Sequence, residues 1–279
     1  MASITLAKFR LVTQLSDDVL PREQAIQAMC AGSWAARRIT GREFGHSIEF
    51  AKQIPATNDV AIEIFGHKLP DSGKVLMGGT GVVALTGVLD YVSIDKDHIK
   101  VANVTLATQI ACGVVCPQVI AQSRVIEQMA ILQPGPVARV IEVRIRRGSM
   151  LSGGGPFPDS SIAPTTAWYA STASPSWNGE LEVYGNTESF VRRPGMINPV
   201  KVRTKREIQA VYYAGCLLGM PDDLETAIAS VGSELAKDPS GMFQSENYDY
   251  YSYQRMDPEM ISKLPMSALA TLYSYRRGR

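Results

Sequence analysis

Residues 137–147 read VARVIEVRIRR, and aliphatic and charged side chains alternate along the second half of this stretch. In an extended chain the aliphatic residues would point to one side, and Glu142, Arg144 and Arg146 would point to the other. This alternation is typical of a strand that covers a core with one face and meets solvent with the other. We therefore predict a β-strand here, with a charged outer face.

Residues 46–108, earlier in the chain, also have the composition of β-strands. Runs such as DVAIEIFG and VVALTGVLDYVSI are rich in β-branched residues and are separated by turn signals such as PATND and PDSG. Gly78–Gly81 fits a tight turn between strands, because the Lys and Ser/Thr of a phosphate-binding loop do not follow it. We expect further short strands at 3–13, 180–184 and around 200–203.

Helical periodicity is strongest near the two ends of the chain. Over 21–38, Ile26, Met29, Cys30 and Trp34 fall on one face of a helix.

Four more helices are expected further along the chain. One covers 117–132 and carries an apolar stripe, and another covers 204–218, where Thr204 and Glu207 fit a capping box. A third follows Pro221, and a fourth begins at Asp257 and is kinked or split by Pro265.

This order of elements is not a regular βαβ alternation, so a doubly wound parallel sheet is disfavoured. It predicts an α+β fold: a β-rich body with an N-terminal helix and a C-terminal helical subdomain. We expect a mixed α/β body over 1–147 and a partly ordered Gly/Pro/Ser/Trp loop over 148–179. Residues 180–279 would form a basic strand region and the helical subdomain, packed separately or as one domain with 1–147.

Two of the three tryptophans, Trp168 and Trp177, lie in the loop. Leaving them in water would expose a large apolar area, so we expect the second half of the loop to be packed. They could pack on their own core or on a neighbouring subunit, and we favour the subunit.

The net charge is only +1, but it is unevenly distributed. Residues 1–136 are neutral, 137–206 carry +5 and 207–279 carry −4. A basic middle beside an acidic end suits an anionic partner, since guanidinium groups bind phosphate, or head-to-tail self-association. The candidate nucleic-acid-binding or anion-binding residues are Arg144, Arg146, Arg147, Arg192, Arg193, Lys201, Arg203, Lys205 and Arg206.

Tyrosine is also clustered, with six of eleven tyrosines in the last 32 residues. Tyrosine combines a large contact area with a polar tip and is enriched at interfaces, although ordinary packing of a helical end accounts for the cluster equally well. The candidate self-association residues are Trp168, Tyr169, Trp177, Tyr248, Tyr250, Tyr251 and Tyr253.

No motif indicates a catalytic residue, a metal site or a cofactor. Cys30, Cys112, Cys116 and Cys216 are too few for a disulfide scaffold, and no second ligand pair completes a zinc site, so we expect small buried thiols. Ser93 and Lys96 have the S-x-x-K spacing, but they fall in a strand and turn region and not on a helix.

These observations favour a non-enzymatic, self-assembling structural protein of the capsid, nucleocapsid or matrix kind. Its partners would be other copies of itself and RNA or an anionic membrane, bound through basic strands. No apolar run approaches the ~20 residues of a transmembrane helix, so we expect a location in the cytoplasm or in a virion. The alternative is an intracellular enzyme with a site assembled from distant residues and a lid formed by 153–179.

Overall fold

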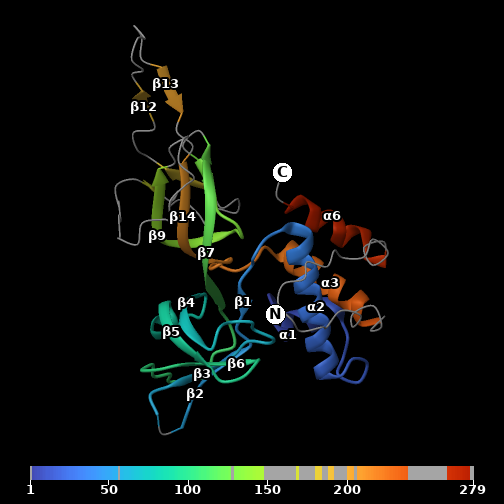
Figure 1. Cartoon of the computed structure of the whole chain (residues 1–279). Helices are drawn as coiled ribbons and strands as arrows, with labels where there is room; N and C mark the ends of the chain where they lie inside the picture. Colours follow the sequence, from blue (N-terminus) through green and yellow to red (C-terminus); the bar gives the residue numbers. More distant parts are fainter. Residues whose placement is uncertain are drawn as a thin grey trace. The chain divides into compact units, whose positions relative to one another are not determined.

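The chain combines helices near its two ends with a large antiparallel sheet, which confirms the predicted α+β class (Figure 1). It divides into two compact units: Met1–Pro117 joins Gly215–Arg279 in the first, and Gln118–Ala214 forms the second. The computed structural model describes residues 2–55, 57–126, 129–147, 168–169, 180–183, 188–191, 200–203, 206–237 and 263–276.

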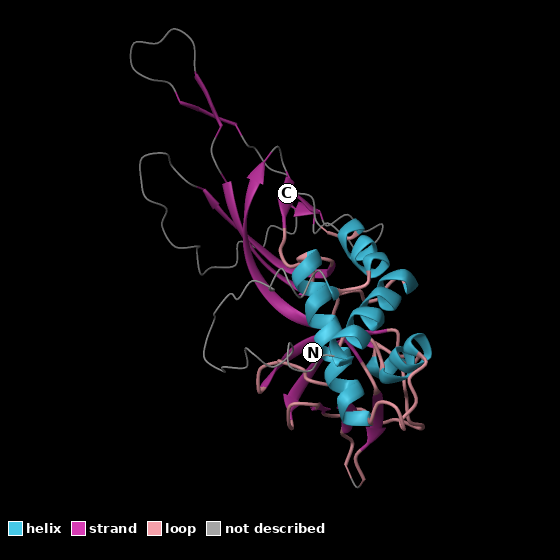
Figure 2. Cartoon of the chain, turned by 90° about the vertical axis from the view of Figure 1, so that its right-hand side faces the viewer, coloured by secondary structure: helices cyan, strands magenta, loops and turns pink. Residues whose placement is uncertain are grey.

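The helices of the first unit pack against one another (Figure 2). They are α1 (Leu6–Thr13), α2 (Arg22–Thr40), α3 (Asp222–Lys237) and α6 (Met266–Ser274). α3 packs along α2 and also contacts α1 and α6. Glycines allow the close approach of α2 and α3: a Cβ on Gly32 would lie 2.4 Å from the carbonyl oxygen of Ile228, and one on Gly232 would lie 2.6 Å from that of Ala28.

The sheet of the first unit is built from short antiparallel strands. They are β1 (His46–Ser47), β2 (Phe50–Gln53), β3 (Val60–Glu63), β4 (Ser72–Gly78), β5 (Gly87–Ser93), β6 (His98–Val101) and the start of β7 (Val114–Ile126). Neighbouring strands follow the order β7-β4-β5-β6-β3-β2, and β1 pairs with β7. Their inward residues form one buried core that includes Ile62, Val75, Met77, Ile99 and Val115. The predicted β-rich region at 46–108 is therefore confirmed.

The second unit is a sheet around the rest of β7. Its strands are β8 (Met129–Ile131), β9 (Val137–Arg147), β10 (Trp168–Tyr169), β11 (Glu180–Val183) and β14 (Arg206–Ala214). β8 and β14 flank β7, β9 pairs with the far edge of β14, and β11 and β10 extend the sheet beyond β8. β12 (Glu188–Val191) and β13 (Val200–Arg203) pair only with each other in the described residues.

Several predicted elements are confirmed, notably the strand at 137–147 and those near 180 and 200. α2 and α3 match the helices expected after Pro21 and Pro221. Pro265 is the N-cap of α6, so it marks a helix start, and the segment from Asp257 to residue 262 lies outside the described residues.

The strand predicted at 3–13 is wrong, because this segment forms α1. The side-chain oxygen of Thr5 caps this helix by accepting a hydrogen bond from the backbone N–H of Lys8 at 3.2 Å. Leu6 and Phe9, one turn apart, are buried and hold the helix on the protein.

The helices predicted at 117–132 and 204–218 are also wrong, because β7 and β14 occupy these segments. β14 pairs along its length with β7 on one edge and with most of β9 on the other, so its backbone N–H and C=O groups are satisfied from both sides. These long-range pairings override the local helical pattern. Thr204 of the expected capping box lies outside the described residues.

The buried face of α2 also differs from the prediction. Trp34 is 44% exposed, and the buried residues are mostly small: Ala25, Ala28, Met29, Gly32, Ser33, Ala35, Ala36, Ile39 and Thr40. A small-residue face lets α3 approach closely, which a face bearing tryptophan would prevent.

Candidate anion-binding face

Antiparallel pairing brings three distant segments into register on the sheet of the second unit. Opposite Val211 of β14 lie Ile120 of β7 and Glu142 of β9, and opposite Gln209 lie Gln122 and Arg144. Because alternate residues of a strand share a face, the positions two residues apart in each strand belong to one face.

The next row of the same face is formed by Glu207, with Arg124 on one side and Arg146 on the other. We call these rows together the open face. It comprises Ile120, Gln122 and Arg124 of β7, Glu207, Gln209 and Val211 of β14, and Glu142, Arg144 and Arg146 of β9.

Burial from Gln118 to Ser123 and from Gln209 to Tyr212 identifies this face as the one that meets solvent along that part of the sheet. Ile120 and Gln122 are exposed, whereas Ala121 between them is half-buried. Likewise Ala210 and Tyr212 of β14 are fully buried, and their neighbour Val211 is not. The hydroxyl of Tyr212 donates to the carbonyl oxygen of Pro134 at 2.9 Å, which fixes the covered side of the sheet.

Arginine is concentrated at one end of the open face. Arg124 lies on β7 and Arg144 and Arg146 lie on β9, on the two sides of β14, and Glu207 of β14 lies in register between Arg124 and Arg146. The set therefore carries a net positive charge. Arginine binds phosphate oxygens in a bidentate manner, so this end of the sheet, which we call the basic end, has the composition of an anion-binding surface.

The structure separates the predicted basic residues into several places. Arg147 of β9 lies directly opposite Arg206 of β14. By strand alternation these two positions belong to the other face of the sheet from Arg144 and Arg146. Like charges at opposed positions destabilise a ladder, so an anion bound there would relieve the repulsion. Lys201 and Arg203 lie on β13 opposite Phe190 and Glu188. Arg192, Arg193 and Lys205 lie outside the described residues.

The predicted aromatic interface is described only in part. Trp168 and Tyr169 form β10 and pair with Val183 and Glu182 of β11. The rest of the 148–179 loop, including Trp177, lies outside the described residues, as do Tyr248, Tyr250, Tyr251 and Tyr253.

Sequence reasoning missed Arg124 and Ile120, because it assigned their segment to a helix. The run QVIAQSR carries no period of two, because Val119, Ile120 and Ala121 are consecutive apolar residues and the three residues after them are consecutive polar ones. The local pattern therefore gave no signal for this strand.

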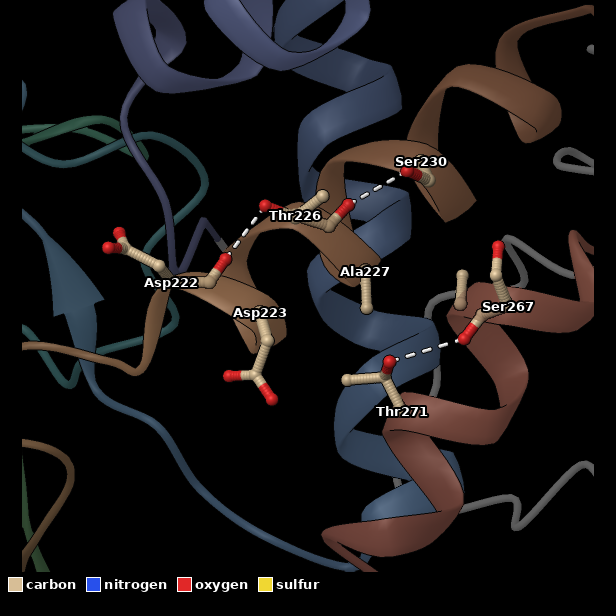
Figure 3. Close-up of a pocket in the computed structure, with 8 residues that line it drawn as sticks. Asp222, Asp223, Thr226, Ala227, Ser230, Ser267 and Thr271 are labelled. Carbon is tan, nitrogen blue, oxygen red and sulfur yellow. Dashed lines mark hydrogen bonds between the residues drawn. The ribbon is translucent and has the colours of Figure 1, made fainter.

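A second candidate site is a pocket of about 280 Å³ between α3 and α6 (Figure 3). Asp222 at its edge is paired with Lys8 at 2.9 Å, and both carboxylate oxygens of Asp223 accept from the Tyr275 hydroxyl. The hydroxyls of Thr226, Ser230 and Thr271 donate to carbonyl oxygens of their own helices. The acids and these hydroxyls are therefore held in structural contacts, and among the described residues that line the pocket no hydroxyl donates to a carboxylate.

A third candidate is a buried ionic cluster at the end of α2. Arg37 donates to Glu43 at 2.9 Å, to the carbonyl oxygen of Gly45 at 3.0 Å and to the hydroxyl of Ser3 at 3.0 Å. Burial raises the pKa of Glu43, and the charge of Arg37 partly offsets this. The contacts tie the N-terminal segment, α2 and the chain before β1 together, so we assign the cluster a structural role.

His46 belongs to the same cluster and gives it a pH dependence. Burial, followed by the charge of Arg37, holds the pKa of His46 well below its usual value. In the unfolded chain His46 takes up a proton near pH ~6.5, whereas in the folded chain it stays neutral to a lower pH. The free energy of unfolding therefore falls as the pH drops below about 6.5. Between about pH 7 and pH 5 we expect His46 to remove about 1 to 2 kcal/mol, measured by urea unfolding.

The matched variants are His46→Gln and Ile48→Val. His46→Gln keeps a hydrogen-bond acceptor for Arg37 and should flatten the pH dependence. Ile48→Val shortens a neighbouring buried side chain without removing a titratable group, and should lower stability equally at both pH values. An unchanged slope in His46→Gln would assign the pH dependence to other groups.

Two thiols confirm the expectation of buried cysteines, and two differ from it. Cys116 and Cys216 are buried, which raises the pKa of both, that of Cys216 to about 12. Cys30 is half-buried and Cys112 is exposed. Among the described residues no group of His, Cys, Asp and Glu has the arrangement of a metal site.

Within the described part of the chain, no helix is both long and apolar enough to cross a bilayer. Comparison with known protein families, curated proteins and solved structures finds no match to this chain.

Proposed function

We propose that this chain is a non-enzymatic structural protein that self-assembles and binds an anionic polymer or surface through the basic end of the open face. The observation that supports this proposal is the register of β7, β14 and β9, which gathers Arg124, Arg144 and Arg146 from segments far apart in the sequence. Arginines at positions separated by a strand suit repeated phosphate groups better than a single small ligand, since each could bind a different phosphate.

Self-assembly is supported by the charge distribution. The acidic end of the chain, residues 207–279, complements the basic segment of a neighbouring copy. Assembly of this kind is heterologous and forms rings or open arrays. Light scattering after size-exclusion chromatography measures it directly, and a monomer at high protein concentration would remove this part of the proposal.

The enzyme alternative has less support. The pocket between α3 and α6 has its two acids occupied by Lys8 and Tyr275, and the loop expected to act as a lid lies outside the described residues apart from β10. We therefore keep the binding function as the conclusion.

The test is the double charge reversal Arg144→Glu with Arg146→Glu in the full chain. Its binding is measured on a fluorescent single-stranded RNA and on vesicles containing phosphatidylserine, at low and high salt. Since each basic side chain contributes about fivefold at an anionic surface, the variant should bind its partner at least ~25-fold more weakly and with a smaller salt dependence.

The matched control is Lys68→Glu with Lys96→Glu, which changes the charge equally at two exposed positions of the first unit. This control should bind within about threefold of the wild type, because long-range repulsion is screened at physiological salt. Equal weakening in both variants would show an effect of net charge alone and would exclude the basic end as the site.

A further inference from the structure

The open face carries exposed aliphatic side chains beside the basic end. Ile120 is 65% exposed. Ile141 is the unpaired residue of a bulge in β9, between Val140 and Glu142, and is 43% exposed, so the bulge leaves it open to solvent although strict alternation predicted it on the covered side. Val211 lies between these strands on β14 and is half-buried. We call Ile120, Ile141 and Val211 the apolar row.

A further isoleucine extends this surface across β8. Ala130 pairs with Val125, so alternation places the next residue, Ile131, on the side of Arg124. Ile131 is 47% exposed. Exposed isoleucines thus lie on three strands of this sheet: Ile131 on β8, Ile120 on β7 and Ile141 on β9.

We infer that the anionic partner of this face is a lipid bilayer, with the apolar row entering the interfacial region while the basic end binds lipid phosphates. This inference rests on the proposed anion-binding function and names its partner. All side chains of one sheet face rise from the same surface, so a face lying on a bilayer brings isoleucine and arginine to it together. Apolar burial and attraction to anionic lipids then add.

The same positions fit RNA less well. Single-stranded RNA is bound by basic residues interleaved with exposed aromatic rings, on which the bases stack. The named positions of the open face carry isoleucine, valine, glutamine, glutamate and arginine, and none is aromatic. Tyr213, the next register position on β14, is 1% exposed and offers no ring. Aliphatic side chains gain nothing from a phosphate backbone, whereas they gain free energy in a bilayer interface.

The neighbouring glutamines and acids are compatible with this partner. Gln122 and Gln209 separate the apolar row from the basic end and are uncharged. Glu207 lies in register between Arg124 and Arg146, so its charge is outweighed locally. Glu142 lies in the row of Ile120 and Val211, so the face carries three arginines against two glutamates. Its net charge is therefore +1, beside the exposed apolar side chains.

The experiment replaces the exposed isoleucines without changing charge. Ile120→Thr with Ile141→Thr keeps β-branched residues, which favour strands, and removes apolar surface. Co-sedimentation is measured with vesicles of phosphatidylcholine alone and of phosphatidylcholine with phosphatidylserine. We expect the wild-type chain to bind only the anionic vesicles, and the variant to bind them about tenfold more weakly.

Val92→Thr with Ile94→Thr is the matched control, because these residues of the first unit are 50% and 54% exposed. It should bind the anionic vesicles as the wild type does. Far-UV circular dichroism and the urea midpoint verify that both variants fold. Binding to the single-stranded RNA should not change in either variant.

The outcomes separate the inference from the proposed function. If the wild type bound RNA but not vesicles, the bilayer would be excluded as the partner and the anion-binding function would remain. Binding to neither would remove both. The inference would also be overturned if the isoleucine variant bound the anionic vesicles as strongly as the wild type does. If that variant also formed smaller oligomers than the wild type, this face would lie between copies of the chain.

Discussion

Gly32→Ala will lower the free energy of unfolding by about 3 kcal/mol, although alanine is the better helix former by about 1 kcal/mol. The reason is the contact between α2 and α3. A Cβ at position 32 would lie 2.4 Å from the carbonyl oxygen of Ile228 and 2.8 Å from the backbone nitrogen of Gly232, so no side-chain rotation can relieve it. The two helices would have to separate, which loosens the core between them.

Thermal or urea unfolding measures the effect, with an expected fall in Tm of about 10 °C. Gln27→Ala is the control, because Gln27 is an exposed residue of α2 and alanine there should leave stability within about 0.5 kcal/mol. Gly32→Ala combined with Gly232→Ala should lose less than the sum of the single losses, since helices already pushed apart accept the second methyl group more easily. A stabilised Gly32→Ala would contradict the close crossing.

Arg37→Met will lower the free energy of unfolding by about 3 to 5 kcal/mol. Arg37 and Glu43 have side-chain exposures of 10% and 17%, so the variant leaves a carboxylate in the interior without its cation. It also removes the donors to Ser3 and to the carbonyl oxygen of Gly45. Chemical denaturation near neutral pH measures the loss.

Glu43→Gln added to Arg37→Met should recover a large part of this stability, because the unpaired buried charge is then absent. The single variant should also regain stability as pH falls. Burial raises the pKa of Glu43 above its value in the unfolded chain, and loss of Arg37 raises it further, so the folded state takes up the proton first. A double variant no more stable than Arg37→Met would show that the lost hydrogen bonds, and not the buried charge, dominate.

Local sequence patterns were sufficient where the period of the apolar residues or a glycine-rich turn matches the element that forms. The alternation in VARVIEVRIRR predicted β9, and the spacing of apolar residues after Pro221 predicted α3. The GGTG turn after β4 was predicted from glycine alone, and Gly79 and Gly81 both have positive φ values of 69°, which other residues rarely adopt.

The errors concern segments whose conformation depends on distant partners. The apolar stripe at 117–132 fits a helix, but β7 gains hydrogen bonds from β14 and β8 that no local pattern encodes. α1 was mistaken for a strand, since a short amphipathic segment is ambiguous until packing decides it. Helical spacing grouped Trp34 with Met29 on one face, but such spacing shows which residues share a face and not which face is buried.

The candidate site shows the same division. The sequence determined that the middle of the chain is basic, that its strands alternate and that its end is acidic, because composition and period two are properties of neighbouring residues. Only the tertiary structure decided that Arg124 joins Arg144 and Arg146, that Arg147 and Arg206 lie on the other face, and that Ile120 is exposed beside them. Register and burial arise from hydrogen bonds and packing between segments far apart in the chain. The sequence of one strand does not specify which strand pairs with it.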